Sequence, residues 1–161
     1  MKKSLSFILA IALVFSMFAP MAFAADETAG EYLQRIGVIK GSLGGDLMEN
    51  DNWKRQDVTV ILSRLLAAEA EAQATAKSHT FADVTDPFYD GYISWSKENG
   101  LFQGHSNVRF GYNEDITTYD FLAVMLSALG YDTTGENYAL VGDMAVELGL
   151  VSADADLQEA A

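Results

Sequence analysis

An internal repeat constrains the fold of this chain more than any other feature. Residues 37–66 align with residues 100–129 without a gap, which pairs Gly37 with Gly100, Gly41 with Gly104, Leu47 with Phe110, Asp57 with Asp120 and Leu66 with Leu129. A weaker third copy follows, in which Tyr138, Met144 and Gly149 correspond to Tyr89, Trp95 and Gly100. Repeats of this length form stacked units that share a core and offer binding surfaces. The pattern favours a binding or structural protein over an enzyme.

Apolar spacing predicts that the repeats are helical. The first copy carries an apolar stripe at helical spacing, formed by Val58, Ile61, Leu62, Leu65 and Leu66. The second copy repeats this stripe with Phe121, Val124, Met125, Ala128 and Leu129. A second helix precedes each glycine pair, over residues 89–98 and around Tyr32, and residues 138–148 match it in the third copy. Each unit is therefore predicted to be a helix, a glycine-bounded loop and a second helix.

Helix ends are predicted from capping residues. Thr117 is expected to cap the second stripe helix with Asp120 close behind it, and Gly130 to end that helix. The first stripe helix has Lys54 at the matching position, so Asp51 or Asn52 is expected to cap it. Its far end is expected to run on over residues 67–76, an Ala/Glu-rich stretch with little to bury, as a solvent-exposed linker.

The beginning of the chain has the pattern of a secretory signal peptide. Lys2 and Lys3 precede an apolar run over residues 5–18, and Ala22-Phe-Ala24 offers small residues for cleavage. The apolar run is short for a bilayer span, which takes roughly 20 residues. We expect cleavage after Ala24 and no membrane segment afterwards. The absence of cysteine favours a bacterial cell-surface protein, because small secreted eukaryotic domains commonly carry disulfides.

The charge of the chain excludes one class of partner. The formal net charge is −13, which argues against nucleic acid, whose phosphates need a basic surface. The basic residues are not evenly spread, because most of those that follow the signal segment fall in the first repeat: Arg35, Lys40, Lys54, Arg55 and Arg64. They are either an ordinary solvated surface or the place where an anionic ligand binds.

Several motifs, in the same order in both copies, give the chain a resemblance to the S-layer homology domain. The residues that carry it are Phe81-Ala-Asp-Val84, Trp95, Gly100-Leu-Phe-Gln-Gly104, Phe110, the helix starts Trp53-Lys-Arg-Gln-Asp57 and Ile116-Thr-Thr-Tyr-Asp120, and Leu129-Gly130. The resemblance implies a mainly α fold, in which helix-loop-helix repeats form a pseudo-threefold bundle. On this reading residues 1–24 are the signal peptide and residues 25–161 one domain. Its parts are repeat 1 (25–66), a linker (67–80), repeat 2 (81–131) and an incomplete repeat 3 (132–161).

The resemblance also implies a function. Domains of this family anchor surface proteins non-covalently to the bacterial cell wall by binding secondary cell wall polysaccharides, often pyruvylated. The arginine of the family's helix-start motif corresponds to Arg55, whose planar guanidinium suits a carboxylate. Lys54 and Lys40 are the neighbouring basic residues, and Trp53 is either a sugar-stacking indole or a packed one. Arg55 has an alternative role as a surface residue paired with Asp51 or Asp57, and Asp57 and Asp120 are expected to be caps.

The sequence departs from the family pattern in all three copies, and the first copy lacks the Phe-x-Asp-Val opening because the signal peptide occupies that stretch. Thr118 stands where the second copy should have its arginine, and the third copy stops at residues 157–161, before a second helix. The last helix could therefore act as a cap, a second chain could complete the bundle, or the sequence could be a natural truncation. The alternative function is a structural or protein-interaction module of the cell surface, with self-association or a partner chain on the uncovered side.

Other chemistry has little support in the sequence. His79 and His105 are far apart with no cysteine between them, which disfavours a zinc site. Asp83, Asp86 and Asp90 lack the spacing of an EF-hand. Glu114 and Asp115 are consecutive acids in an acidic chain, and such a pair alone does not indicate a glycosidase. We therefore expect no enzyme activity and no cofactor.

Overall fold

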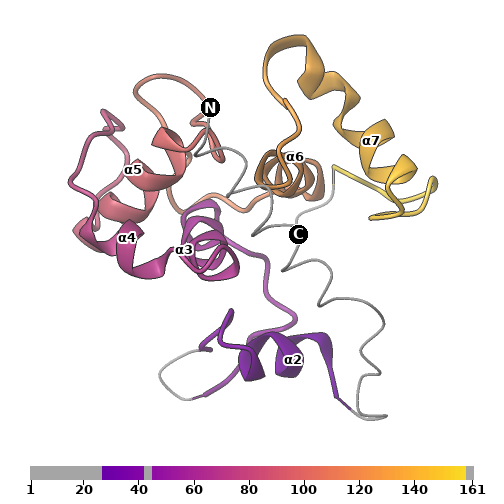
Figure 1. Cartoon of the computed structure of the whole chain (residues 1–161), viewed down its shortest axis with the longest axis horizontal. Helices are drawn as coiled ribbons and strands as arrows, with labels where there is room; N and C mark the ends of the chain where they lie inside the picture. Colours follow the sequence, from indigo (N-terminus) through magenta and orange to yellow (C-terminus); the bar gives the residue numbers. More distant parts are fainter. Residues whose placement is uncertain (1–26, 42–44, 159–161) are drawn as a thin grey trace, which may run out of the picture. The chain divides into compact units, whose positions relative to one another are not determined.

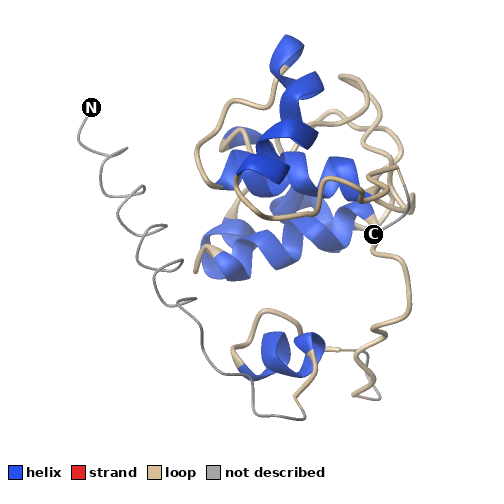
Figure 2. Ribbon diagram, turned by 90° about the vertical axis from the view of Figure 1, so that its right-hand side faces the viewer, coloured by secondary structure: helices blue, strands red, loops and turns tan. Residues whose placement is uncertain are grey.

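A computed structural model describes residues 27–41 and 45–158, which belong to two units, residues 1–51 and 52–161. The predicted signal peptide lies outside the described residues. The described residues form helices and loops without any strand (Figure 2), which confirms the mainly α fold. The elements are α2 (Ala29–Arg35), α3 (Arg55–Leu65), α4 (Glu69–Ala74), the 3-10 helix η1 (Pro87–Tyr89), α5 (Asp90–Glu98), α6 (Thr118–Ala128), the 3-10 helix η2 (Gly135–Leu140) and α7 (Val141–Glu147). The threefold arrangement of the repeats remains a prediction.

The first unit contains α2 and the loop that follows it. Thr28 and Glu31 form a capping box at the start of the helix. The carboxylate of Glu49 accepts the Thr28 hydroxyl at 2.6 Å and the Gly30 backbone N–H at 2.9 Å. A side chain at Gly30 would meet Glu49, because a Cβ there would lie 2.2 Å from its Oε1. Glu49 therefore joins the end of the loop to the helix start.

In the second unit, the starts of α3 and α6 are joined to each other. The N-cap of α3 is Lys54, with no side-chain cap, so the prediction that Asp51 or Asn52 caps this helix is wrong. The Arg55 N–H instead donates to the Glu114 carbonyl at 3.0 Å, and the Ile116 N–H donates to the Trp53 carbonyl at 2.9 Å. The Glu114 carbonyl of the second repeat thus satisfies one of the free N–H groups at the start of α3.

The predicted ends of α6 are confirmed. The Thr117 hydroxyl accepts the Asp120 N–H at 3.1 Å. The helix ends at Ala128, and Gly130 follows with a φ of 92°, a conformation that glycine adopts without steric cost. Residues 138–148, predicted as one helix, are divided between η2 and α7.

The continuation of α3 over residues 67–76 is wrong. The helix ends at Leu65, Ala67 has a φ of 54°, and α4 begins at Glu69 as a separate helix. Ala72 of α4 is fully buried, and Gly91 of α5 lies so close that a Cβ on it would be 2.5 Å from the Ala72 carbonyl oxygen. The chain turns because α4 packs against α5 (Figure 1), so this stretch buries surface that its composition does not suggest.

Two apolar clusters form the core of the second unit, and α6 contributes to both. Val124 and Ala128 belong to the larger cluster, which α3 and α5 complete with residues such as Leu62 and Trp95. The other face of α6 belongs to a smaller cluster with α7, consisting of Leu122, Ala123, Leu126, Val141 and Ala145. The predicted stripe on α6 therefore omits three of its buried residues, Leu122, Ala123 and Leu126. None of the helices in the described residues is long and apolar enough to cross a bilayer.

Candidate functional site

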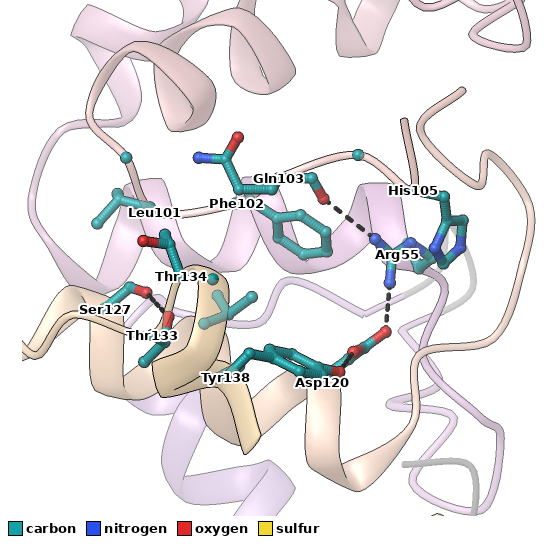
Figure 3. Close-up of a pocket in the computed structure, with 15 residues that line it drawn as sticks. Arg55, Leu101, Phe102, Gln103, His105, Asp120, Ser127, Thr133, Thr134 and Tyr138 are labelled. Carbon is teal, nitrogen blue, oxygen red and sulfur yellow. Dashed lines mark hydrogen bonds and ion pairs between the residues drawn. The ribbon is translucent and has the colours of Figure 1, made fainter. Parts of the chain in front are cut away.

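A pocket of about 500 Å³ lies in the second unit, where the glycine loop of the second repeat meets α6 and the segment that leads into η2 (Figure 3). We call it the Arg55 pocket. Arg55 reaches it from the first turn of α3, and the remaining lining residues are Gly100, Leu101, Phe102, Gln103, Gly104, His105, Asp120, Ala123, Val124, Ser127, Thr133, Thr134, Gly135 and Tyr138. Each of three successive repeats contributes to it.

The glycine loop, residues 100–104, has a shape that needs glycine at both of its ends. Gly100 has a φ of 69°, which disfavours a side chain. Gly104 is closely packed: a Cβ on it would lie 2.5 Å from the Phe81 ring and 2.6 Å from the Arg109 carbonyl oxygen. Phe102 between them is buried, and the Arg55 guanidinium carbon lies 4.8 Å from the centre of its ring. The loop thus provides an aromatic face beneath the arginine.

Arg55 is the most constrained charge in the pocket. It is 4% exposed, and its Nε donates to the Phe110 carbonyl at 3.1 Å, while its Nη2 donates to the Gln103 carbonyl at 3.2 Å. Its Nη1 donates to Oδ2 of Asp120 at 2.6 Å. Burial lowers the pKa of the guanidinium, and the Asp120 carboxylate opposes that shift. The alternative pairing with Asp51 or Asp57 is wrong, because the partner is Asp120 in the second repeat.

Asp120 also joins the pocket to the third repeat. The Tyr138 hydroxyl donates to Oδ1 of Asp120, and the Tyr119 hydroxyl donates to the Tyr138 carbonyl at 2.6 Å. Burial and the bond to Asp120 raise the pKa of Tyr138. The carboxylate of Asp120 was expected to cap a helix, but it instead bridges Arg55 and Tyr138.

Gly111 leaves the space that Arg55 needs beside His105. A Cβ at Gly111 would lie 2.7 Å from Nε2 of His105 and 2.8 Å from Nε of Arg55, and its φ is 91°. Nε2 of His105 lies 3.1 Å from Oε2 of Glu114. Glu114 also pairs with Arg109, and these neighbours lower its pKa against the effect of its burial. The consecutive acids Glu114 and Asp115 therefore serve in ion pairs, since Asp115 pairs with Lys54.

The other predicted site residues do not line the pocket. Lys54 forms its ion pair with Asp115 at the α3–α6 junction. Trp53 is half-buried and meets the Phe121 ring edge-on at a centroid distance of 5.8 Å, which identifies it as a packing residue. Lys40 is exposed in the first unit. Arg35 and Arg64 pair with Glu27 and Glu69 at 2.7 and 2.8 Å. The basic residues of the first repeat are thus largely matched by acids.

Sequence reasoning missed most of the pocket wall. Asp120, Tyr138, Thr133 and Thr134 were not among the predicted ligand-binding residues. A signal for two of them existed in the repeat alignment, because Asp57 and Tyr89 are the equivalents of Asp120 and Tyr138 and form the same contact, with the Tyr89 hydroxyl 2.7 Å from Oδ1 of Asp57.

The acids weighed as calcium ligands have other roles. Asp83 accepts the backbone N–H groups of Phe110, Gly111 and Tyr112 at 2.7–2.9 Å. Burial alone would raise its pKa, but these three donors lower it overall. Asp86 caps η1 through the Phe88 N–H, and Asp90 pairs with Lys77 and His79. Within residues 27–41 and 45–158, no group of three His, Asp or Glu side chains is placed to hold a metal ion.

Comparison with known proteins places relatives of this chain at the bacterial surface. It is 24% identical over 145 residues to a surface layer protein of Brevibacillus choshinensis, a match that covers 82% of this chain and 13% of that protein. A cellulosome-anchoring protein of Acetivibrio thermocellus is 30% identical over 87 residues, covering 53% of this chain and 20% of that protein. An endoglucanase of Bacillus sp. (strain KSM-635) is 30% identical over 149 residues, covering 81% of this chain and 15% of the enzyme.

These matches are partial in two respects. The chain spans a fifth or less of the length of each of these relatives. No protein-family model matches the chain, and no solved structure matches it. The finding is therefore a low-identity similarity to surface-layer, cell-wall and anchoring proteins.

Proposed function

We propose that this chain attaches non-covalently to the bacterial cell wall by binding a secondary cell wall polysaccharide in the Arg55 pocket. Its relatives include a surface layer protein and a cellulosome-anchoring protein, and the match covers most of this chain in the first case. The observation that carries the proposal is the pocket itself, which has a buried guanidinium in its wall and a glycine-bounded loop along one side.

The size and lining of the pocket suit a sugar. Ligand sites typically enclose about 300–1,000 Å³ and combine apolar walls with a few polar groups. Here the aromatic and aliphatic wall includes Phe102 and Val124, and polar atoms come from Arg55, Thr134 and the loop backbone. An arginine carries five N–H groups, and three of those of Arg55 have described protein acceptors. We propose that the other two donate to an uncharged oxygen of the ligand.

We further propose that the ligand carries an acidic group, of which a pyruvyl carboxylate is the leading candidate. A buried guanidinium favours a carboxylate through charge-assisted hydrogen bonds, which are stronger than neutral ones. The acidic chain as a whole repels polyanions, since its formal charge is −13, so the contact must be local and short-ranged.

The proposed role is anchoring without catalysis. The match to an endoglucanase covers 15% of that enzyme, and similar stretches match proteins named for surface layers and anchoring. One attachment module common to all these proteins explains the shared region more simply than a catalytic domain does. The proposed location is accordingly the cell surface, after secretion and removal of residues 1–24.

A second candidate function is a protein-interaction module, because the end of the second repeat and the third repeat expose apolar side chains. Several large ones are between 38% and 50% exposed around α7: Tyr131, Tyr138, Leu140, Val146, Leu148 and Leu150. A second chain that packs against this stretch would cover them. Analytical ultracentrifugation of the mature chain tests this candidate, since a monomer over the micromolar range excludes self-association.

Sedimentation with purified cell-wall sacculi tests the anchoring function. The mature chain should pellet with sacculi that retain the secondary polymer and stay in solution once the polymer is extracted. Arg55→Lys keeps the charge but loses the planar fork, and Thr134→Trp fills the pocket from an exposed position. Both changes should reduce pelleting. Lys54→Ala is the matched control, because Lys54 is next to Arg55 but outside the pocket.

The variants must also be shown to fold, because Arg55 holds three parts of the structure together. Circular dichroism and a thermal melt of each variant supply that control. If folded Thr134→Trp pellets as well as the wild type, the polymer does not enter this pocket. If the wild type stays in solution with polymer-bearing sacculi, the anchoring function itself is wrong.

A further inference from the structure

The arginine that the proposed function assigns to an acidic ligand already holds a carboxylate from its own chain. Oδ2 of Asp120 lies 2.6 Å from Nη1 of Arg55. Both side chains line the same pocket, and Asp120 is the more accessible, with 25% of its side chain exposed against 5% for Arg55. A ligand that enters the pocket therefore meets Asp120 beside the guanidinium (Figure 3).

We infer that Asp120 is a specificity-determining residue that competes with the ligand for Arg55. An acidic sugar binds when its carboxylate takes the place of Asp120 on the guanidinium, whereas a neutral sugar leaves the internal ion pair intact. The inference rests on the proposed function, because it concerns the ligand of the same pocket.

Electrostatics require the competition. Two carboxylates on the same side of one guanidinium repel each other, and in a partly buried site that repulsion is only weakly screened. The pair of Arg55 and Asp120 is neutral as a unit, so an anion that binds without displacing Asp120 meets no net positive charge. Displacement restores a one-to-one pairing, now between the arginine and the ligand.

The contacts of the two residues show which one can move. Arg55 is held by two backbone carbonyls, of Phe110 and Gln103, which remain in place when Asp120 leaves. Asp120 has a second partner, because the Tyr138 hydroxyl donates to its other oxygen. The aspartate can therefore turn from Arg55 and keep one hydrogen bond, while the arginine stays oriented for an incoming acid.

The first repeat supplies an internal comparison. Asp57 occupies the position equivalent to Asp120 and accepts the Tyr89 hydroxyl at 2.7 Å. No arginine is among the described contacts of its carboxylate. The same substitution at Asp57 thus removes an aspartate–tyrosine contact without exposing a guanidinium, which makes it the matched control.

Chemical rescue with a small acid is the direct test. Asp120→Ala in the mature chain leaves Arg55 without a carboxylate, which lowers the melting temperature, and sodium pyruvate should restore part of the loss relative to sodium chloride at equal ionic strength. Wild type should respond less, because Asp120 occupies the site. Asp57→Ala should lose stability without pyruvate rescue. Equal pyruvate responses of all three proteins would overturn the inference.

Binding to polymer is the second measurement, and it uses Asp120→Asn, which preserves side-chain shape. This variant should bind extracted acid-bearing wall polymer at least about fivefold more tightly than wild type, the lower end of usual coupling effects. After mild acid has removed the ketal-linked acids from the polymer, the two proteins should bind alike. Tighter binding of the variant to both polymers, or weaker binding to the acidic one, would contradict competition for Arg55.

The two measurements separate this inference from the proposed function. Equal binding of wild type and Asp120→Asn to acidic polymer, without pyruvate rescue, overturns the competition but leaves wall binding intact. Pyruvate rescue of Asp120→Ala supports the competition even when neither protein binds polymer, and in that case the proposed function is the part that fails.

Discussion

Tyr89 donates its hydroxyl to Asp57 at 2.7 Å and thereby joins η1 of the second repeat to α3 of the first. Burial and this bond raise the pKa of Tyr89, so the hydroxyl stays protonated and remains a donor. Tyr138 and Asp120 form the same contact one repeat later. A tyrosine near the start of one repeat thus donates a hydrogen bond to an aspartate in the first turn of the second helix of the repeat before it, which is α3 or α6.

Tyr89→Phe should destabilise the chain by about 1–2 kcal/mol, since a hydrogen bond to a charged acceptor is lost while the ring remains. Urea unfolding followed by circular dichroism measures the change. Tyr131→Phe is the control, because Tyr131 is an exposed tyrosine of the same unit. Equal unfolding free energies of Tyr89→Phe and wild type would show that the Tyr89–Asp57 contact contributes nothing.

Gly104→Ala should destabilise the chain by about 1–3 kcal/mol, the usual cost of overpacking. Its Cβ would lie within 2.6 Å of both the Phe81 ring and the Arg109 backbone, and the backbone cannot easily yield. Differential scanning calorimetry measures the loss. Gly142→Ala in α7 should be nearly neutral or stabilising, because the nearest atom there is the flexible end of Leu157 at 3.1 Å. A neutral Gly104→Ala would mean that the loop is not held against Phe81.

Asp83→Asn should destabilise the chain by about 1–3 kcal/mol, because an amide oxygen is a weaker acceptor than the carboxylate for three backbone N–H groups. The lowered pKa of Asp83 means that its contribution is present above its unfolded value and lost as the pH falls through the folded one. Urea midpoints at pH 7 and pH 3 test both statements. Asp143→Asn is the control and should change neither midpoint, because Asp143 is an exposed residue of α7.

Stability should decline below about pH 6.5 because of His79, whose ordinary unfolded pKa is 6.5. His79 is buried, and its Nδ1 accepts the Phe81 N–H at 3.3 Å, so the ring is neutral with its proton on Nε2 towards Asp90. Burial lowers the pKa of His79, with Lys77 and Lys97 acting the same way and Asp90 opposing them. Below this pH, His79 binds a proton in the unfolded chain but not in the folded chain. Stability is therefore lost as the pH falls through the unfolded pKa.

Urea unfolding between pH 7.5 and pH 5 measures that slope. His79→Gln should lower stability at pH 7.5 but flatten the dependence on pH. A slope in His79→Gln as steep as in wild type would assign the pH dependence to other groups.

Local rules predicted the helices well where the pattern and the packing agree. Val58 and Leu62 face the core as their spacing indicates, and Thr117 caps α6 as its hydroxyl and position suggest. The rules failed where distant residues decide. Ala72 is buried because Gly91 of α5 lets another helix approach, and neither residue alone indicates that contact.

Of the residues that line the candidate pocket, the sequence singled out only Arg55. Arg55 follows from its place in the repeat motif, but its partner Asp120 lies in the next repeat, and pairing between repeats depends on how α3 and α6 meet. The number of basic residues in the first repeat also overstated its positive charge. Lys54 and Arg64 look like part of a basic surface in the sequence, but each pairs with an acid. Sequence position gives the charge of a residue, whereas only the packed structure gives its neighbours.

The division of α6 between two clusters has a mechanical consequence if the chain has the proposed anchoring function. The smaller cluster, with α7, contains few buried side chains, and the Tyr138 ring contacts Tyr119, which packs against that cluster. Tension applied beyond α7 would peel the small cluster first and draw the Tyr138 hydroxyl from Asp120, while the larger cluster keeps Arg55 in position. The pocket would therefore lose the contact between Tyr138 and Asp120 under tension before the rest of the second unit begins to unfold.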